Sequence, residues 1–135
     1  MVMIPSPDPL TRLVVDEAVI NRELLATVLQ DRVRLDLSRG SFTFLPGARD
    51  RLNNRQHVVA ALLARKALHL LKAEFADGLR PQELEAATGI KGGTLRPILR
   101  VLVERRLIGQ SDEKAYVVPG YALEDASRFL NEDGG

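Results

Sequence analysis

The chain contains no cysteine and no tryptophan, and only 4% of its 135 residues are aromatic. Without cysteine, disulfide bonds and thiolate metal sites are excluded, and redox chemistry gives no indication of the compartment. No apolar run approaches the roughly 18 residues that a membrane span needs. Residues 1–9 lack the basic flank and apolar core of a signal peptide, so we expect a cytoplasmic protein without a membrane partner.

Catalytic and metal-binding motifs are also missing. The two histidines, His57 and His69, stand twelve residues apart without a carboxylate at ligand spacing, so both are expected at the surface or the edge of the core. The glycine-rich stretch 89–93 has neither the preceding strand nor the Gly-Lys-Ser/Thr ending of a P-loop. Nucleophile elbows and dinucleotide fingerprints are absent. We therefore expect no enzymatic activity, no metal and no cofactor.

The composition that remains is typical of one folded domain. Hydrophobic residues make up 45% of the chain and charged residues 27%, and a chain of this length can bury a core without disulfides. The net charge of +1 conceals separate blocks, because residues 49–72 and 91–106 are mostly basic and residues 111–135 mostly acidic. Such blocks favour a basic face for an anionic partner, although each could equally be a solvated helix face.

The N-terminal third predicts an arm, a helix and a β-hairpin. Residues 1–9 carry three prolines at alternate positions and are expected to form a flexible arm. Residues 16–30 place apolar side chains on one helical stripe behind an acidic start. Residues 32–45 alternate apolar and polar on both sides of Ser38-Arg39-Gly40, which predicts a hairpin. Its apolar face is expected to carry Val33, Leu35, Leu37, Phe42 and Phe44.

A long second helix is predicted next. It starts at Asn53 or Asn54, either of which could cap it, and runs to Phe75, with Asp77-Gly78 ending it. Its apolar residues cover more of its surface than one core-facing stripe requires. We therefore expect this helix to be packed on two sides or shared across a dimer interface.

Residues 81–106 predict two helices joined by a tight turn, the helix-turn-helix arrangement. Pro81 suits the first turn of a helix that runs to Thr88. Gly89 then turns the chain and Ile90 fills the corner.

The second of these helices is expected over residues 94–106. Pro97 is compatible with a start only a few residues earlier, because an N–H in the first turn has no intrahelical partner. Arg96, Arg100 and Glu104 fall on one outward ridge. The inward stripe is expected to contain Leu95, Ile98, Leu99 and Leu102.

The last third predicts a small hairpin and a short helix. The runs 107–110 and 115–118 flank a polar turn and form a wing-like hairpin. Its turn carries Asp112 and Glu113, whose charges would be repelled by phosphates, so we expect this wing to avoid DNA. Residues 121–131 predict a helix that docks on the core or on a second subunit. Its apolar side is expected to contain Tyr121, Leu123, Ala126, Phe129 and Leu130.

The run Gly93-Thr-Leu-Arg-Pro-Ile-Leu-Arg-Val-Leu-Val-Glu-Arg-Arg-Leu-Ile108 resembles the recognition helix and first wing strand of winged helix-turn-helix DNA-binding domains. It is most similar to the PadR-type pattern of Gly-Thr-Leu-Tyr-Pro, a helix, and then Gly-Leu-Ile. That pattern has tyrosine where this chain has Arg96 and glycine where it has Arg106. The resemblance covers about residues 57–118 and implies a winged-helix fold.

We therefore predict a mainly α fold with small β-hairpins, in which a winged helix-turn-helix follows an N-terminal helix and β-hairpin extension. The predicted divisions are the flexible arm 1–9, the N-terminal helix plus β-hairpin extension 10–48, the winged helix-turn-helix domain 49–120, and the C-terminal short helix and tail 121–135.

Our first hypothesis is a DNA-binding transcriptional regulator, acting as a homodimer on double-stranded DNA with helix 94–106 in the major groove. Glycines before this helix let a phosphate approach its positive N-terminal end, although they could equally serve a tight turn. Arg96 and Arg100 could reach base edges or phosphates. The predicted DNA-binding residues are Lys91, Gly92, Gly93, Thr94, Arg96, Arg100, Arg51 and Arg55.

Our second hypothesis is a winged-helix adaptor that binds a protein partner within a larger assembly, with or without nucleic acid, and reads no DNA itself. Winged helices also serve as protein-docking modules, so the fold alone does not decide between the two. The working surface would then be the N-terminal extension together with the apolar excess of helix 54–75.

Overall fold

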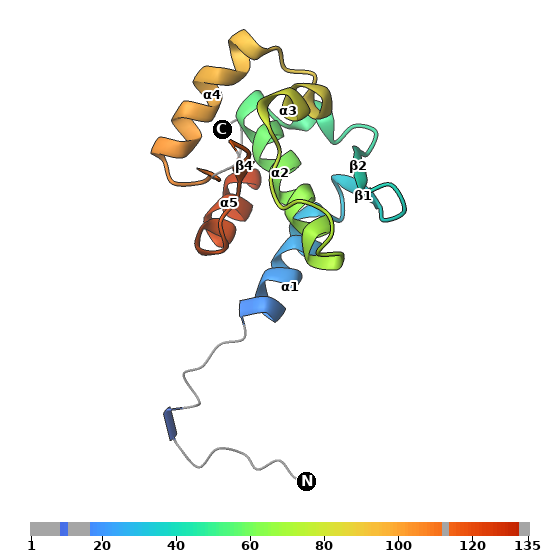
Figure 1. The fold of residues 1–135 in the computed structure, drawn as a ribbon, viewed down its shortest axis with the longest axis vertical. Helices are drawn as coiled ribbons and strands as arrows, with labels where there is room; N and C mark the ends of the chain where they lie inside the picture. Colours follow the sequence, from blue (N-terminus) through green and yellow to red (C-terminus); the bar gives the residue numbers. More distant parts are fainter. Residues whose placement is uncertain (1–8, 11–16, 112–113, 133–135) are drawn as a thin grey trace.

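A computed structural model describes residues 9–10, 17–111 and 114–132 of the chain (Figure 1). Five α-helices and two antiparallel two-stranded sheets make up this part, which confirms the mainly helical class. Most of the predicted arm, and the turn residues Asp112 and Glu113, lie outside the described residues. None of the described helices combines the length and apolar character needed to cross a membrane.

The N-terminal helix and hairpin form as the alternating pattern predicts. These elements are α1 (Glu17–Leu29), β1 (Val33–Asp36) and β2 (Ser41–Phe44). Val33 pairs with Phe44 and Leu35 with Phe42, so the apolar side chains share one face. Leu37 departs from the prediction, because it follows the last paired residue of β1 and is 40% exposed. Beyond the ladder, the pleat no longer directs its side chain inward.

Helix α2 (Asn54–Leu71) is the central helix, preceded by the short 3-10 helix η2 (Arg49–Arg51). Asn53 is the N-cap: its Oδ1 accepts from the Gln56 backbone N–H at 2.8 Å, and Gln56 Oε1 accepts from the Asn53 N–H at 3.1 Å. α2 contacts α1, α3, α4, α5 and both strands of the hairpin, which confirms packing on more than one side.

The predicted end of this helix is wrong. α2 stops at Leu71, and Lys72 adopts an extended conformation, so Phe75 lies outside the helix. The chain folds back because Arg65 Nε donates to the Ala76 carbonyl at 2.7 Å and the ring of Phe75 packs against Gly40. These contacts between distant segments are stronger than the local helical preference of residues 72–75.

The next two helices are α3 (Pro81–Thr88) and α4 (Gly92–Glu104). Gly89 joins them in the left-handed region, with φ of 76°, and Ile90 is buried beneath the turn. Leu95, Ile98, Leu99 and Leu102 are all buried, which confirms the predicted stripe.

Helix α4 starts and ends two residues earlier than the predicted range 94–106. Pro97 is therefore its sixth residue, and the prediction that it lies in the first turn is wrong. Without an N–H, Pro97 leaves the carbonyl of Gly93 without its helical donor. The helix ends where Arg106 takes a positive φ of 60°.

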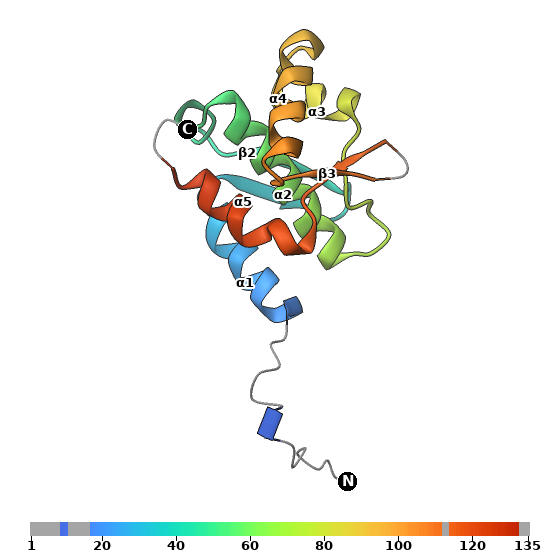
Figure 2. The ribbon, with the colours of Figure 1, turned by 90° about the vertical axis from the view of Figure 1, so that its left-hand side faces the viewer.

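The C-terminal elements are β3 (Gly109–Gln110), β4 (Tyr116–Val117), the 3-10 helix η3 (Gly120–Ala122) and α5 (Leu123–Leu130). Leu79 adds a third segment to the β3–β4 hairpin, exchanging backbone hydrogen bonds with Tyr116 at 2.9 and 2.7 Å. α5 docks on α1 and α2 (Figure 2). Tyr121 does not belong to its apolar side as predicted, because it lies in η3 and is 77% exposed. Buried residues from α1, α2, α3, α4 and α5 form one core.

Candidate nucleic-acid interface

The outer face of α4 is cationic. Arg96 and Arg100 are exposed one turn apart, on the side opposite the buried stripe of the helix. Neither guanidinium has a hydrogen bond or an ion pair with any described residue. Glu104 continues the same ridge at the C-terminal end. The positive charge is therefore concentrated in the first half of α4, where the helix dipole is also positive.

The start of α4 has no side-chain cap. The N-cap residue is Lys91, and the N–H groups of Thr94 and Leu95 both donate to its carbonyl, at 3.0 and 2.8 Å. The amides of Gly92 and Gly93 come before these bonds and have no intrahelical acceptor. A helix start of this kind attracts anions.

The two glycines at this start have different surroundings. A Cβ at Gly93 would meet nothing within 4 Å, which leaves room for a ligand at the backbone. A Cβ at Gly92 would lie 3.3 Å from Oε2 of Glu85. The close packing considered as the alternative for the glycines therefore applies to Gly92, whereas Gly93 is open to solvent.

A polar hollow of about 350 Å³ lies between the starts of α2 and α4. Its lining side chains are neutral or cationic, and the turn from Thr88 to Ile90 is part of the lining. Arg49 holds this turn in place, because its Nη2 donates to the Thr88 carbonyl. The polar side chains that line the hollow are Arg49, Asn54, His57, Thr88, Lys91 and Thr94.

His57 is 5% exposed and packs edge-to-face on Phe44, with ring centroids 4.8 Å apart. Its Nε2 is buried and has no hydrogen-bond partner in the described part of the chain. Burial and, secondarily, the charge of Arg49 lower the pKa of His57 below its ordinary value. No local sequence pattern assigns His57 to a site, because its place depends on the convergence of η2, α2 and the α3–α4 turn.

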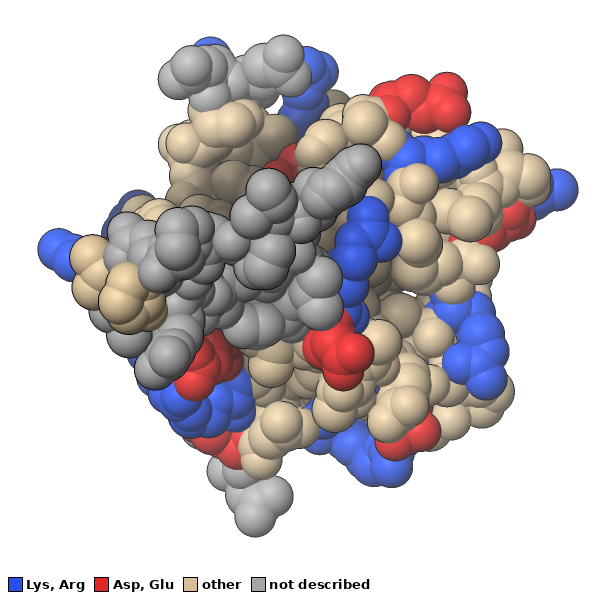
Figure 3. Space-filling view, turned by 90° about the horizontal axis from the view of Figure 1, so that it is seen from below, with Lys and Arg blue, Asp and Glu red and all other residues tan. Residues whose placement is uncertain are grey.

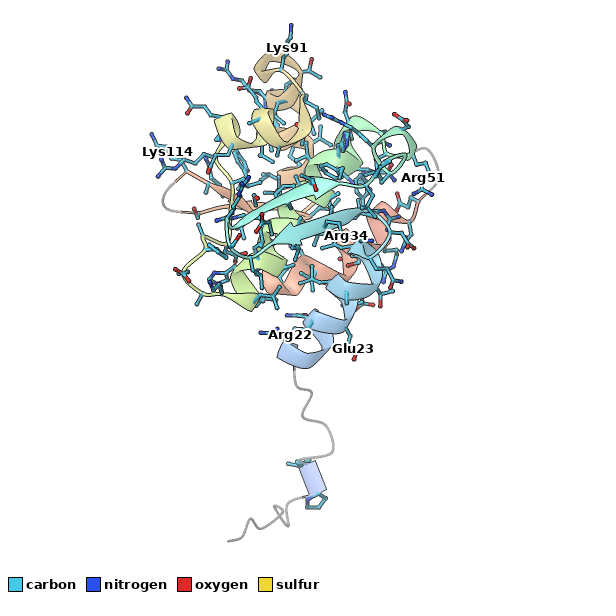
Figure 4. All side chains as sticks on the ribbon, turned by 90° about the vertical axis from the view of Figure 1, so that its right-hand side faces the viewer. Arg22, Glu23, Arg34, Arg51, Lys91 and Lys114 are labelled. Carbon is cyan, nitrogen blue, oxygen red and sulfur yellow. The ribbon has the colours of Figure 1, made fainter. Side chains whose placement is uncertain are left out.

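Arg51 and Arg55 are both exposed but lie apart from the polar hollow. Arg51 borders a different hollow that also includes Asp31, Arg32 and Glu132. There, burial and then the charge of Arg51 lower the pKa of Arg32. In Figure 4, Lys91 lies at one end of the molecule, at the start of α4, and Arg51 lies on one side of the molecule.

An apolar hollow of about 370 Å³ lies at the other end, between α1, β1 and the end of α2. Leu71 is half exposed there, and Arg22 at the rim donates to the Leu70 carbonyl at 2.6 Å. On the face seen from this end, basic and acidic side chains are interspersed among neutral ones (Figure 3). The apolar lining consists mainly of Leu25, Leu29, Val33, Leu35, Leu70 and Leu71.

The part of the chain that the structure describes contains no group of three or more His, Cys, Asp or Glu residues that could hold a metal ion. Comparison with protein-family models finds no match, and comparisons with curated proteins and with solved structures also find none. The features that bear on function are therefore the charge of α4, the polar hollow and the apolar hollow.

Proposed function

We propose that the protein is a winged helix-turn-helix domain that binds double-stranded DNA and regulates transcription. The observation that carries this proposal is the pair Arg96 and Arg100, exposed one turn apart on α4 without a partner among the described residues. Arginine pairs spaced in this way can reach base edges and phosphates when a helix lies in the major groove. The three-segment sheet made by Leu79, β3 and β4 behind α4 supports a winged-helix arrangement.

In this proposal, Lys91, Gly93 and Thr94 contact one phosphate at the start of α4, and Gly92 allows the close packing of that turn. Arg51 and Arg55 contact the backbone at the flank. Contacts of this kind position the protein on the duplex without reading its sequence.

The proposal includes a homodimer, in which a second copy docks on the apolar hollow at the end of α2. One α4 helix gives few contacts, and two copies related by a two-fold axis would present two helices to successive turns of DNA. Leu71 is half exposed in this hollow. A single exposed leucine would not by itself indicate a binding surface. Its position beside seven further apolar lining residues favours a protein contact.

The test of DNA binding is fluorescence anisotropy with random-sequence duplex DNA between roughly 50 and 200 mM salt, where phosphate contacts cause a steep loss of affinity. The double variant Arg96→Glu/Arg100→Glu should abolish binding without changing the thermal unfolding curve. A matched control is Arg34→Glu/Arg39→Glu, which removes the same charge from the exposed hairpin. Equal losses in both double variants would mean that only net charge matters, and would contradict the assignment to α4.

The apolar hollow also favours a second candidate function, an adaptor that docks a different protein there. Sedimentation velocity distinguishes the two. Leu71→Arg should convert a dimer into a monomer, while Leu37→Arg, on the hairpin turn outside the hollow, should not. A monomer with no affinity for DNA would favour the adaptor over the regulator.

A further inference from the structure

The outer edge of β2 presents free backbone groups. The β1–β2 sheet has two strands, so β2 has a neighbouring strand on one side only. Immediately beyond the ladder, the Leu45 N–H donates to the Arg32 carbonyl at 2.8 Å. Hydrogen-bonded and non-hydrogen-bonded positions alternate along an antiparallel pair, so Phe44 and Phe42 occupy non-hydrogen-bonded positions. Their backbone N–H and C=O groups therefore point away from β1.

The two edges of this sheet are protected differently. On the β1 side, the Val33 carbonyl accepts from Arg34 Nη1 at 3.4 Å, so a charged side chain covers part of the edge. On the β2 side, no described residue forms a hydrogen bond with the backbone of Phe42 or Phe44. Proteins commonly protect a free edge with charges, proline or a short strand. β2 contains neither a charge nor a proline, so only its shortness limits pairing.

A groove of about 550 Å³ runs along this free edge, between β2 and α3. In Figure 1, β2 lies on the α3 side of β1. Residues 42–47 all line this β2 groove, and Ala86 and Ala87 of α3 form part of its opposite wall. Successive side chains of a strand point to opposite faces, so a groove lined by consecutive strand residues follows the edge of the strand. The small side chains of α3 leave space beside that edge.

The charges of the β2 groove restrict what can occupy it. Phe42 and Phe44 are half-buried, with ring centroids 6.0 Å apart, and no charged side chain lies along the strand. The charged lining residues are Arg49 and Asp50, which have opposite signs and follow the strand. A matching occupant is therefore uncharged in its middle and offers backbone groups at every second residue. An extended peptide has this spacing, whereas a helix uses its backbone groups internally and DNA carries a charge at every phosphate.

We propose that the β2 groove binds an extended, uncharged segment of a partner protein, which adds a third strand beside β2. The backbone of the segment exchanges hydrogen bonds with Phe42 and Phe44, and its apolar side chains contact the two rings. In this mode of recognition the main-chain hydrogen bonds give affinity and alternate side chains give specificity. The inference goes beyond the proposed function, because it involves neither α4 nor the apolar hollow.

Amide hydrogen exchange of the full-length protein, followed by NMR, tests whether the edge is free. Thr43 lies opposite Arg34 at a hydrogen-bonded position. The Phe42 and Phe44 amides should therefore exchange about tenfold or more faster than the Thr43 amide. Equal protection of the three amides would overturn the proposal. Protection that grows with protein concentration would assign the edge to a second copy and would also overturn it.

The binding test uses a displayed library of short, uncharged random peptides selected on the wild-type protein. Selected peptides should alternate β-branched or aromatic residues, lack proline, and slow the exchange of the Phe42 and Phe44 amides. The strongest binder is then synthesised in two forms, N-methylated at its odd or at its even positions. One form should lose binding and the other keep it, because only one set of amides faces β2. Equal affinities of the two forms, or no selected peptide that protects these amides, would overturn the proposal.

A substitution on the opposite wall tests the position of the segment. Ala86→Arg places a long side chain in the β2 groove and should weaken peptide binding about tenfold or more. Gln82→Arg is the matched control, because Gln82 is exposed on the same helix but outside the groove lining. Both variants should unfold at the temperature of the wild-type protein. Unchanged peptide affinity in Ala86→Arg, or equal losses in both variants, would contradict binding between β2 and α3.

Discussion

Positive φ angles at Gly40, Gly89 and Arg106 turn the chain at three places that define its shape. Gly40 lies in the β1–β2 hairpin turn, Gly89 between α3 and α4, and Arg106 at the end of α4. Glycine adopts this conformation without strain, whereas Arg106 has a Cβ that the left-handed region disfavours.

Gly40→Ala should lower the free energy of unfolding by about 2 kcal/mol or more, through left-handed strain and crowding combined. The crowding arises because a Cβ would lie 2.5 Å from Cε1 of Phe75. Gly47→Ala is the control, since its φ is 83° but a Cβ there meets nothing within 4 Å. It should cost only about 1 kcal/mol. Urea unfolding measures both, and equal losses would show that Phe75 does not press on the turn.

Arg106→Gly should raise the free energy of unfolding by about 1 kcal/mol, because relief of the left-handed strain exceeds the added entropy of the unfolded chain. The neighbouring change Arg105→Gly should have the opposite sign, since Arg105 has a φ of −80° and its guanidinium lies 5.0 Å from the Phe129 ring centroid. Thermal unfolding of the two variants compares them directly. A loss of stability in both would contradict the assigned backbone conformation.

At the scale of elements, the segment after α2 depends on side chains of α2 itself. Arg65 bonds to Ala76 and also donates from Nη1 to the Gly40 carbonyl at 2.8 Å. Lys66, whose side chain is only 10% exposed, forms an ion pair with Asp77 at 2.8 Å. These contacts connect the end of α2 to the hairpin tip and lead the chain towards α3.

Asp77→Ala should destabilise the protein by about 2 to 3 kcal/mol, because it leaves the buried ammonium of Lys66 without its counter-charge. The double variant Lys66→Met/Asp77→Ala should recover most of this loss, since an apolar side chain needs no counter-charge. Chemical denaturation of the single and double variants forms a double-mutant cycle. If the double variant were less stable than Asp77→Ala, the ion pair would not be the cause.

Helix α4 combines an interior proline with an uncapped start. Pro97 cannot donate to Gly93, and Lys91 provides no side-chain cap, so polar backbone groups remain available in the first two turns. In a helix without a ligand this arrangement weakens the N-terminal end. In the proposed function it places free amides where a phosphate would bind.

At the scale of the whole molecule, the two candidate surfaces lie at opposite ends of α2. The polar hollow adjoins its start, and the apolar hollow adjoins its end. A second copy bound at the apolar end would therefore leave the polar end free for an anion. This separation lets DNA binding and dimer formation be tested by independent substitutions.

Stability should depend on pH through His57. Because the pKa of His57 is lowered in the folded state, the unfolded chain binds more protons as pH falls. The contribution of the neutral ring is therefore complete above its ordinary pKa of about 6.5 and is lost as pH decreases below it. Urea unfolding between about pH 5.5 and 8 should show this fall.

The control for this pH dependence is His57→Phe, which keeps an aromatic ring against Phe44 but cannot be protonated. Its stability should be nearly constant over the same range. An equally steep fall in His57→Phe would assign the effect to other groups.

The sequence by itself determined the periodic elements. Alternation predicted a hairpin with Val33 and Phe44 on one apolar face, and the 3.6-residue period predicted the buried stripe of α4 from Leu95 to Leu102. It also identified the turn at Gly89 and the exposed pair Arg96 and Arg100. These features depend on neighbours within one or two turns, and such neighbours are visible in a linear pattern.

Only the tertiary structure decided where α2 ends, that Tyr121 is exposed, and that Arg49, His57 and Lys91 surround one hollow. α2 ends at Leu71 because Arg65 and Gly40 draw the following residues back onto the hairpin. The polar hollow joins segments that are more than thirty residues apart. Contacts over such separations depend on how the elements pack, and local periodicity carries no information about them.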